Sequence, residues 1–181
     1  DTPVTVFEKL VGDEPGFLLE SVEGGEQWGR WSFLGWDPAF TVTSREGVVA
    51  VDDPAVELPA GDPLTALAGL VDRYRSPDLP APPGPPPPPA GAVGSLGYAC
   101  VRYIERLPAM PPDDRGLPEM VWQFVGALGA MDRFRQTLVL VRNVFVGDDP
   151  AAQHAAAVAA LEADVARLAR PVPTPVSPVP A

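Results

Sequence analysis

The residue whose surroundings most suggest chemistry is Glu20, a carboxylate inside the apolar run of residues 17–22. The alternation of a β-strand places Glu20 on one face and its neighbours Leu19 and Ser21 on the other. A carboxylate buried among leucines without a partner costs several kcal/mol or takes up a proton. Glu20 is therefore expected to face an arginine, backbone amides or a cationic ligand. A structural pair with Arg30 on the following strand is one of these possibilities.

Other reactive residue types are better explained by structure. His154 is the single histidine, and it lies in an alanine-rich stretch without Ser, Cys or a paired acid at a useful offset, so it is predicted to be exposed on a helix. Cys100 lacks a neighbouring base and is predicted to be a small buried residue. The glycines of residues 91–97 lack the lysine of a phosphate loop. The sequence therefore predicts no catalytic residues and no metal ligands, and its acid pairs are assigned to turns and caps: Asp52-Asp53, Asp113-Asp114 and Asp148-Asp149.

The net charge argues against nucleic acid and membranes as partners. Thirteen Lys and Arg stand against 24 Asp and Glu among 181 residues, which gives a net charge of −11 and a pI of about 4.4. An acidic chain repels phosphate backbones and anionic lipids. A single cysteine cannot form an internal disulfide, no apolar run approaches the ~20 residues that cross a bilayer, and no secretory leader opens the chain. These features predict a cytoplasmic protein.

Two proline-rich segments divide the chain. Residues 76–90 hold nine prolines between positions 77 and 89, which predicts an internal surface loop of polyproline II character. Residues 171–181 alternate proline with small residues, as is typical of a linker. We therefore expect one domain over residues 1–170, followed by a linker toward further chain.

Short strands and helices account for the remainder. The punctuation by Gly, Pro and Asp predicts an antiparallel meander of strands at residues 17–22, 30–36, 40–44 and 48–51. Further strands are predicted at residues 91–96, 122–131 and 137–146, the last two as a hairpin. Helices are predicted at residues 4–11, 62–74, 98–107 and 149–169, the last with Val158, Leu161, Val165 and Leu168 as its buried stripe. The predicted fold class is α+β, an antiparallel sheet with helices packed on it.

Two neighbouring blocks resemble a known family. Residues 17–23, Phe-Leu-Leu-Glu-Ser-Val-Glu, and residues 29–35, Gly-Arg-Trp-Ser-Phe-Leu-Gly, closely resemble the opening of anthranilate synthase component I. Residues 91–108 and 118–141 are similar to the next blocks of that family, which it shares with the sister enzyme that makes aminodeoxychorismate. The chain departs from the family pattern at Ala99, where Asp is frequent, and at Arg133, where His is usual. The resemblance implies the amino-terminal portion of the chorismate-utilising enzyme fold.

This resemblance implies a regulatory region without an active site of its own. In the family the amino-terminal part binds L-tryptophan as a feedback effector, which implies an effector wall of Leu19, Glu20 and Ser21, with Trp31 as a further contact. The chorismate-to-anthranilate lyase reaction of tryptophan biosynthesis and its Mg²⁺ belong to a carboxy-terminal catalytic domain. That domain and a glutamine amidotransferase subunit or domain are the implied partners.

Two other interpretations remain open. The chain resembles the same region of an aminodeoxychorismate synthase component I or a secondary-metabolism paralogue, in which bound tryptophan would be structural or missing. It could also be an interaction module whose prolines at residues 85–89 dock in an aromatic groove. No basic residue flanks that run, which disfavours the interaction module.

Overall fold

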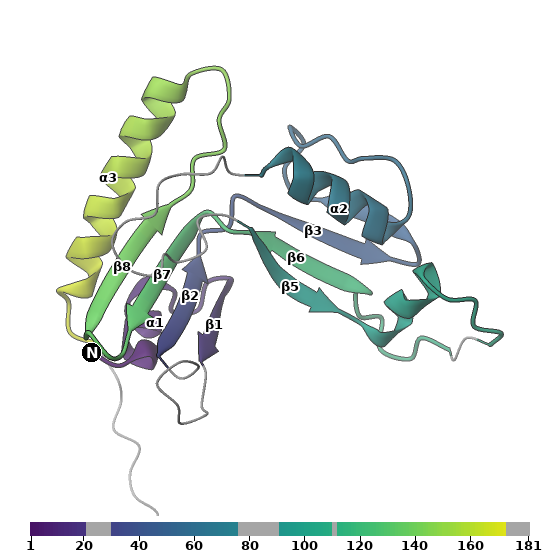
Figure 1. The fold of residues 1–181 in the computed structure, drawn as a ribbon, viewed down its shortest axis with the longest axis horizontal. Helices are drawn as coiled ribbons and strands as arrows, with labels where there is room; N and C mark the ends of the chain where they lie inside the picture. Colours follow the sequence, from purple (N-terminus) through teal and green to yellow (C-terminus); the bar gives the residue numbers. More distant parts are fainter. Residues whose placement is uncertain (21–29, 76–90, 110–111, 173–181) are drawn as a thin grey trace, which may run out of the picture. The chain divides into compact units, whose positions relative to one another are not determined.

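The computed structural model describes residues 1–20, 30–75, 91–109 and 112–172. The chain divides into two compact units (Figure 1): unit 1 comprises Asp1–Trp36 with Leu128–Ala181, and unit 2 comprises Asp37–Ala127. Each unit contains one four-stranded sheet with helices. The predicted α+β class is confirmed, although the single predicted sheet is two. The extent of the predicted domain, residues 1–170, stays a prediction.

Unit 1 is built on a sheet with the strand order β1-β2-β7-β8. Helix α1 lies against β1 and β2, while α3 lies against β8 and α1. Thr2 caps α1 by accepting a hydrogen bond from the Thr5 amide, and Asp149 caps α3 in the same way through Ala152. Leu34 and Leu10 are fully buried in this unit. The element bounds are α1 Pro3–Leu10, β1 Gly16–Glu20, β2 Trp31–Trp36, β7 Ala127–Asp132, β8 Thr137–Arg142 and α3 Pro150–Leu168.

Unit 2 is built on a sheet with the order β4-β3-β6-β5, all of whose pairs are antiparallel. Asp62 caps α2 through the amides of Leu64 and Thr65, as the Asp-Pro signal predicts. The rings of Phe40 and Phe124 stack 4.3 Å apart beneath Tyr74, which closes the core under α2. The bounds are β3 Phe40–Arg45, β4 Val48–Val51, α2 Pro63–Arg73, β5 Ala92–Leu96, the 3₁₀ helix η1 Tyr98–Tyr103 and β6 Met120–Phe124.

The predicted meander of four strands is wrong, because β2 and β3 belong to different sheets. Between them Asp37 takes a left-handed conformation with φ of 49°, and Pro38 has no N–H to continue a ladder. The predicted strand 122–131 also divides, into β6 and β7. At that division a Cβ on Gly126 would lie 2.1 Å from the carbonyl oxygen of Asp37, so only glycine fits. The predicted pairing of the next strand is confirmed, because β7 and β8 are neighbours.

Two helix predictions also need correction. The helix predicted at residues 98–107 is the shorter η1. In α3 the predicted stripe is wrong in part, since Val158 and Val165 are exposed. The most buried residue of α3 is instead Asp164, whose carboxylate binds Arg142. Leu161 and Leu168, the other two residues of the predicted stripe, are half-buried, and their spacing puts them on the same face as Asp164.

The predicted proline-rich loop at residues 76–90 lies outside the described residues, as do residues 173–181 of the predicted linker. The predictions for His154, Cys100 and two of the turn acids are confirmed. His154 is exposed and Cys100 is buried. Asp53 and Asp113 accept backbone hydrogen bonds within their turns. Among the described residues, no helix has both the length and the apolarity needed to cross a membrane.

Candidate functional site

The strand predicted to bind an effector, β1, lies at the edge of the sheet in unit 1. It pairs antiparallel with β2, so that Leu19 lies opposite Phe33 and Glu20 lies opposite Ser32. Paired residues share a face of the sheet, and residues two apart on one strand share that face too. Leu19 and Trp31 therefore lie on one face, and Glu20 lies on the other. Ser21, the fourth predicted site residue, lies outside the described residues.

The face that carries Leu19 and Trp31 is apolar and partly open. Trp31 stacks on Phe33 with ring centroids 6.2 Å apart, and the Phe17 ring lies across Gly35. Leu19 is 50% exposed. These side chains offer aromatic and aliphatic surface that a planar apolar ligand could cover.

The side chain of Glu20 is exposed, which corrects the expectation of a buried charge. Ser32 and Leu34, which lie on the same face of the sheet as Glu20, are buried. Glu20 is exposed because it is the last residue of β1. The alternative of a structural pair with Arg30 is wrong, because the guanidinium of Arg30 binds Asp132. No ion pair joins Glu20 to another residue of the described ranges.

Arg30 and Asp132 form a bidentate ion pair beside Trp31. The Nε and Nη2 atoms of Arg30 donate to the two carboxylate oxygens at 2.9 and 2.5 Å. The guanidinium lies 5.3 Å from the centre of the Trp31 ring and 5.7 Å from that of Phe134. Asp132 also accepts the amides of Phe134 and Arg135, which close the turn after β7. The pair therefore places a cation beside the rings of Trp31 and Phe134. Sequence reasoning missed it because its partners are 102 residues apart.

Curated proteins named anthranilate synthase component 1 are similar to the chain. Over an alignment of 188 residues the chain is 37% identical to anthranilate synthase component 1 of Mycobacterium tuberculosis, covering 98% of this chain and 36% of that protein. It is 38% identical over 156 residues to anthranilate synthase component 1 of Thermus thermophilus, covering 83% of this chain and 30% of that one. The chain belongs to the anthranilate synthase component I family. It spans about a third of the length of these relatives. No protein-family model matches it.

A solved structure shows the component I fold. Anthranilate synthase component I from Streptococcus pneumoniae matches with a TM-score of 0.60 and 21% identity, covering 96% of this chain and 36% of that one. The fold of this chain is therefore similar to that of the matched part of the component I structure.

The ion pair between Arg30 and Asp132 should make the stability of unit 1 depend on pH in the acid range. The hydrogen bond from Arg30 holds the pKa of Asp132 at about 2, below its ordinary value near 3.9. A carboxyl with a lowered folded-state pKa stabilises the fold above its unfolded-state pKa, and that stabilisation disappears as the pH falls toward the folded-state pKa. We expect the urea midpoint to fall between about pH 4 and pH 2, and the fall to be smaller in Asp132→Asn. Equal falls in both proteins would contradict this role.

In unit 2 the component I chain has a polar cluster around Glu119, which sequence reasoning also missed. One carboxylate oxygen accepts the Ser44 and Tyr103 hydroxyls, both at 2.8 Å, and the Gly47 amide at 3.0 Å. Burial raises the pKa of Glu119, but these three hydrogen bonds together lower it further than burial raises it. Burial, and then Glu119, raise the pKa of Tyr103 to about 12. The cluster joins the β3–β4 turn to η1 and β6, and its partners are internal to unit 2.

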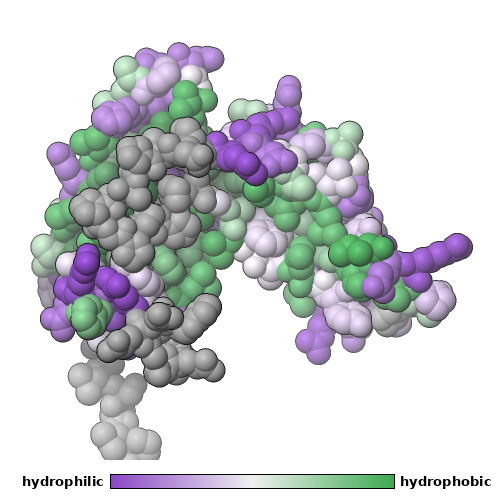
Figure 2. Space-filling model, viewed as in Figure 1, coloured by the Kyte–Doolittle hydropathy of each residue, from purple (hydrophilic) through white to green (hydrophobic). Residues whose placement is uncertain are grey.

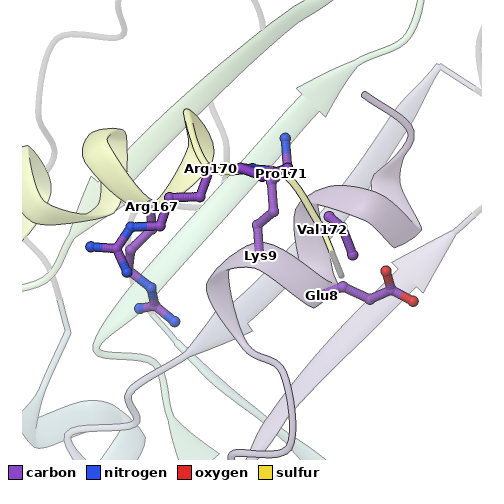
Figure 3. Close-up of a pocket in the computed structure, with 6 residues that line it drawn as sticks. All are labelled: Glu8, Lys9, Arg167, Arg170, Pro171 and Val172. Carbon is purple, nitrogen blue, oxygen red and sulfur yellow. The ribbon is translucent and has the colours of Figure 1, made fainter. Parts of the chain in front are cut away.

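A cavity of about 170 Å³ lies where the last turns of α1 and α3 meet (Figure 3). Lys9 donates to the Leu168 carbonyl at 3.0 Å, and Arg167 donates to the Leu10 carbonyl. Each helix thus supplies a cation to the carboxyl end of the other, where the helix dipole is negative. These contacts explain the cluster of cations as a helix-capping device. The lining residues are Glu8, Lys9, Arg167, Arg170, Pro171 and Val172.

The described residues do not fit a magnesium site. Among residues 1–20, 30–75, 91–109 and 112–172, no group of three His, Cys, Asp or Glu side chains could hold a metal ion. Magnesium prefers several oxygen ligands in octahedral geometry. No step of chemistry is therefore assigned to a metal held by these residues.

Proposed function

We propose that this chain is the tryptophan-binding, feedback-regulatory amino-terminal region of an anthranilate synthase component I. The full-length lyase would convert chorismate to anthranilate in the tryptophan pathway of the cytoplasm. The observation that carries the proposal is the partly open apolar face of β1 and β2 beside an exposed Glu20, in a chain 37% identical to anthranilate synthase component 1.

The edge position of β1 explains how residues on opposite faces can bind one ligand. A ligand at an outer strand can touch both faces, because no further strand of the described sheet separates them there. The carboxylate of Glu20 would accept hydrogen bonds from the α-ammonium of tryptophan. Leu19 and Trp31 would cover the indole. Burying an indole of ~200 Å² supplies about 5 kcal/mol before the entropy of binding is subtracted.

Regulation and catalysis would be divided between parts of the polypeptide. In this proposal the catalytic residues and Mg²⁺ belong to the carboxy-terminal domain, with a glutamine amidotransferase subunit or domain as a further partner. Feedback requires tryptophan to bind one global state more tightly than another, and a coupling of about 1–3 kcal/mol changes affinity about 5- to 150-fold. The rigid sheet of unit 1 would carry such a difference away from β1.

The proposal is tested by Glu20→Gln in a full-length chimera, in which this chain replaces the aligned segment of the Mycobacterium tuberculosis protein. A hydrogen bond to a charged group contributes about 1.5–3 kcal/mol, so the tryptophan concentration for half-inhibition should rise about tenfold or more. Thermal stability should change little, because Glu20 is exposed. Calorimetric titration of the isolated chain with tryptophan checks the same change without the chimera.

The matched control is Glu14→Gln, the same change at an exposed carboxylate just before β1. Glu14→Gln should leave inhibition unaltered. If both variants have the same tryptophan concentration for half-inhibition as the parent chimera, tryptophan does not bind Glu20. If Glu20→Gln instead lowers the melting temperature, Glu20 has a structural partner.

A further inference from the structure

Ser32 carries a hydroxyl group that is buried without a hydrogen-bond partner. The residue lies on β2 and is 0% exposed, and its Oγ atom forms no hydrogen bond with any residue of the described ranges. A buried hydroxyl without a partner destabilises a fold, and most buried polar groups in native proteins are hydrogen-bonded. The presence of a hydroxyl at this position therefore requires an explanation other than stability.

Another buried serine shows the usual arrangement. Ser44 lies on β3 in unit 2 and is 1% exposed, and its hydroxyl donates to the Glu119 carboxylate at 2.8 Å. Both serines belong to strands of four-stranded sheets. Burial in a strand therefore does not by itself prevent a serine from binding a carboxylate, and Ser44 is a matched reference for Ser32.

The residue directly opposite Ser32 on the neighbouring strand is Glu20. Opposed residues of an antiparallel pair point to the same face of the sheet, with Cβ atoms about 4.5–5.5 Å apart. Glutamate extends beyond Cβ by a further carbon and the carboxylate, and its χ angles have several staggered positions. Rotation of the Glu20 side chain can therefore bring its carboxylate to the Ser32 hydroxyl.

The exposed position of Glu20 is explained by the cost of removing a carboxylate from water. Where the strands of the unit 1 sheet are visible in Figure 2, hydrophobic residues lie over them. A carboxylate that turned toward Ser32 would lose water and gain one hydroxyl donor, which does not compensate for the loss. An ammonium group bound to the same carboxylate would add a charge-assisted hydrogen bond and make the inward position favourable.

We propose that Ser32 is a positioning residue for the effector, whose hydroxyl donates a hydrogen bond to the Glu20 carboxylate when an amino-acid ammonium binds there. One carboxylate oxygen would accept from Ser32 and the other from the ammonium. The inference rests on the proposed function for the identity of the ligand, and it adds a residue and a movement that the proposed function does not include. Ser32 is thus a donor that the strand holds in place for the bound carboxylate.

Ser32→Ala and Ser44→Ala test the proposal in the isolated chain. Ser32→Ala should weaken tryptophan binding about tenfold in calorimetric titration, because it removes a hydrogen bond to a charged group. It should leave the melting temperature unchanged or raise it by about 2–4 °C, because it removes an unsatisfied polar group. Ser44→Ala should lower the melting temperature and leave tryptophan affinity unchanged. Unaltered affinity in Ser32→Ala would overturn the proposal.

The stability of the Ser32 variants separates a positioning role from a structural one. A lowered melting temperature in Ser32→Ala would show that the hydroxyl is already bonded within the fold, and would overturn the proposal. Ser32→Cys keeps most of the side-chain volume but offers only a weak donor. It should weaken tryptophan binding as Ser32→Ala does, which excludes a lost packing contact as the cause.

Combination with Glu20→Gln shows whether Ser32 acts through Glu20, because residues that interact give non-additive effects. In the Glu20→Gln background, Ser32→Ala should change tryptophan affinity by less than about threefold. A further tenfold loss there would show that Ser32 acts independently of Glu20 and would overturn the proposal. A loss in Glu20→Gln but none in Ser32→Ala would overturn this inference alone, whereas no loss in either variant would overturn the proposed function as well.

Discussion

Asp164→Ala is expected to lower the free energy of unfolding of unit 1 by about 3–5 kcal/mol, the range seen when one partner of a buried ion pair is removed. Asp164 is 1% exposed. It accepts two hydrogen bonds from Arg142, at 3.0 and 2.7 Å, and lies 3.4 Å from Arg167. The Arg142 side chain is only 11% exposed, so without the carboxylate its charge would be held away from water. Because whole domains are stable by only about 5–15 kcal/mol, this loss would approach unfolding.

Urea unfolding followed by tryptophan fluorescence measures this effect. The matched control is Glu162→Ala, which removes an exposed carboxylate from the same helix. The control should change the free energy of unfolding by no more than about 0.5 kcal/mol. Equal, small effects of the two substitutions would show that apolar contacts alone hold α3 on the sheet.

The same ion pair shows which parts of the fold the sequence could predict. Helix starts depend on neighbours within one turn, so Asp62 and Asp149, each followed by proline, were sufficient to place α2 and α3. The inward face of α3 depends on a partner 22 residues earlier in β8. The apolar period of the helix therefore predicted that Val165 is buried. In the structure Asp164 is buried instead, because it pairs with Arg142.

Sheet membership depends even more on distant residues. The strands from residue 31 to residue 51 were located correctly. Their order in space depends on β6 and β7, which follow much later in the sequence and lie beside β3 and β2. The turn residues between β2 and β3 permit both a hairpin and a crossing to a second sheet. At this crossing Gly126 closely approaches Asp37, a contact between residues far apart in the sequence that no local pattern encodes.

In the candidate site, strand alternation correctly separated Glu20 from Leu19. That Leu19 shares its face with Trp31 follows only from the register of β1 and β2. Sequence reasoning named the wrong partner for Arg30. It considered a pair with Glu20, the carboxylate nearer in sequence, and overlooked Asp132. Asp132 is better placed, since the turn after β7 fixes both its oxygens against the guanidinium. Glu20 is exposed, and the proposed function assigns its carboxylate to the ammonium of the ligand.

Leu19→Lys is expected to lower the affinity of the full-length chimera for tryptophan about 100-fold. A leucine removed from contact with the indole loses about 1.5–3 kcal/mol of apolar burial, and 2.7 kcal/mol corresponds to a factor of 100. The new ammonium would also compete with that of tryptophan for Glu20. Tryptophan titration by calorimetry measures the change.

The control for this last substitution is Val4→Lys, because Val4 in α1 is 50% exposed, as Leu19 is, and belongs to the same unit. Both variants place one lysine on a half-exposed apolar position, so their effects on stability should be similar and small. Only Leu19→Lys should weaken tryptophan binding, since only Leu19 shares a face with Trp31 and Phe33. Equal affinities in the two variants would move the effector away from β1. A selective loss at Leu19 would mean that the edge strand, with one apolar face and one carboxylate, holds the amino acid at both of its ends.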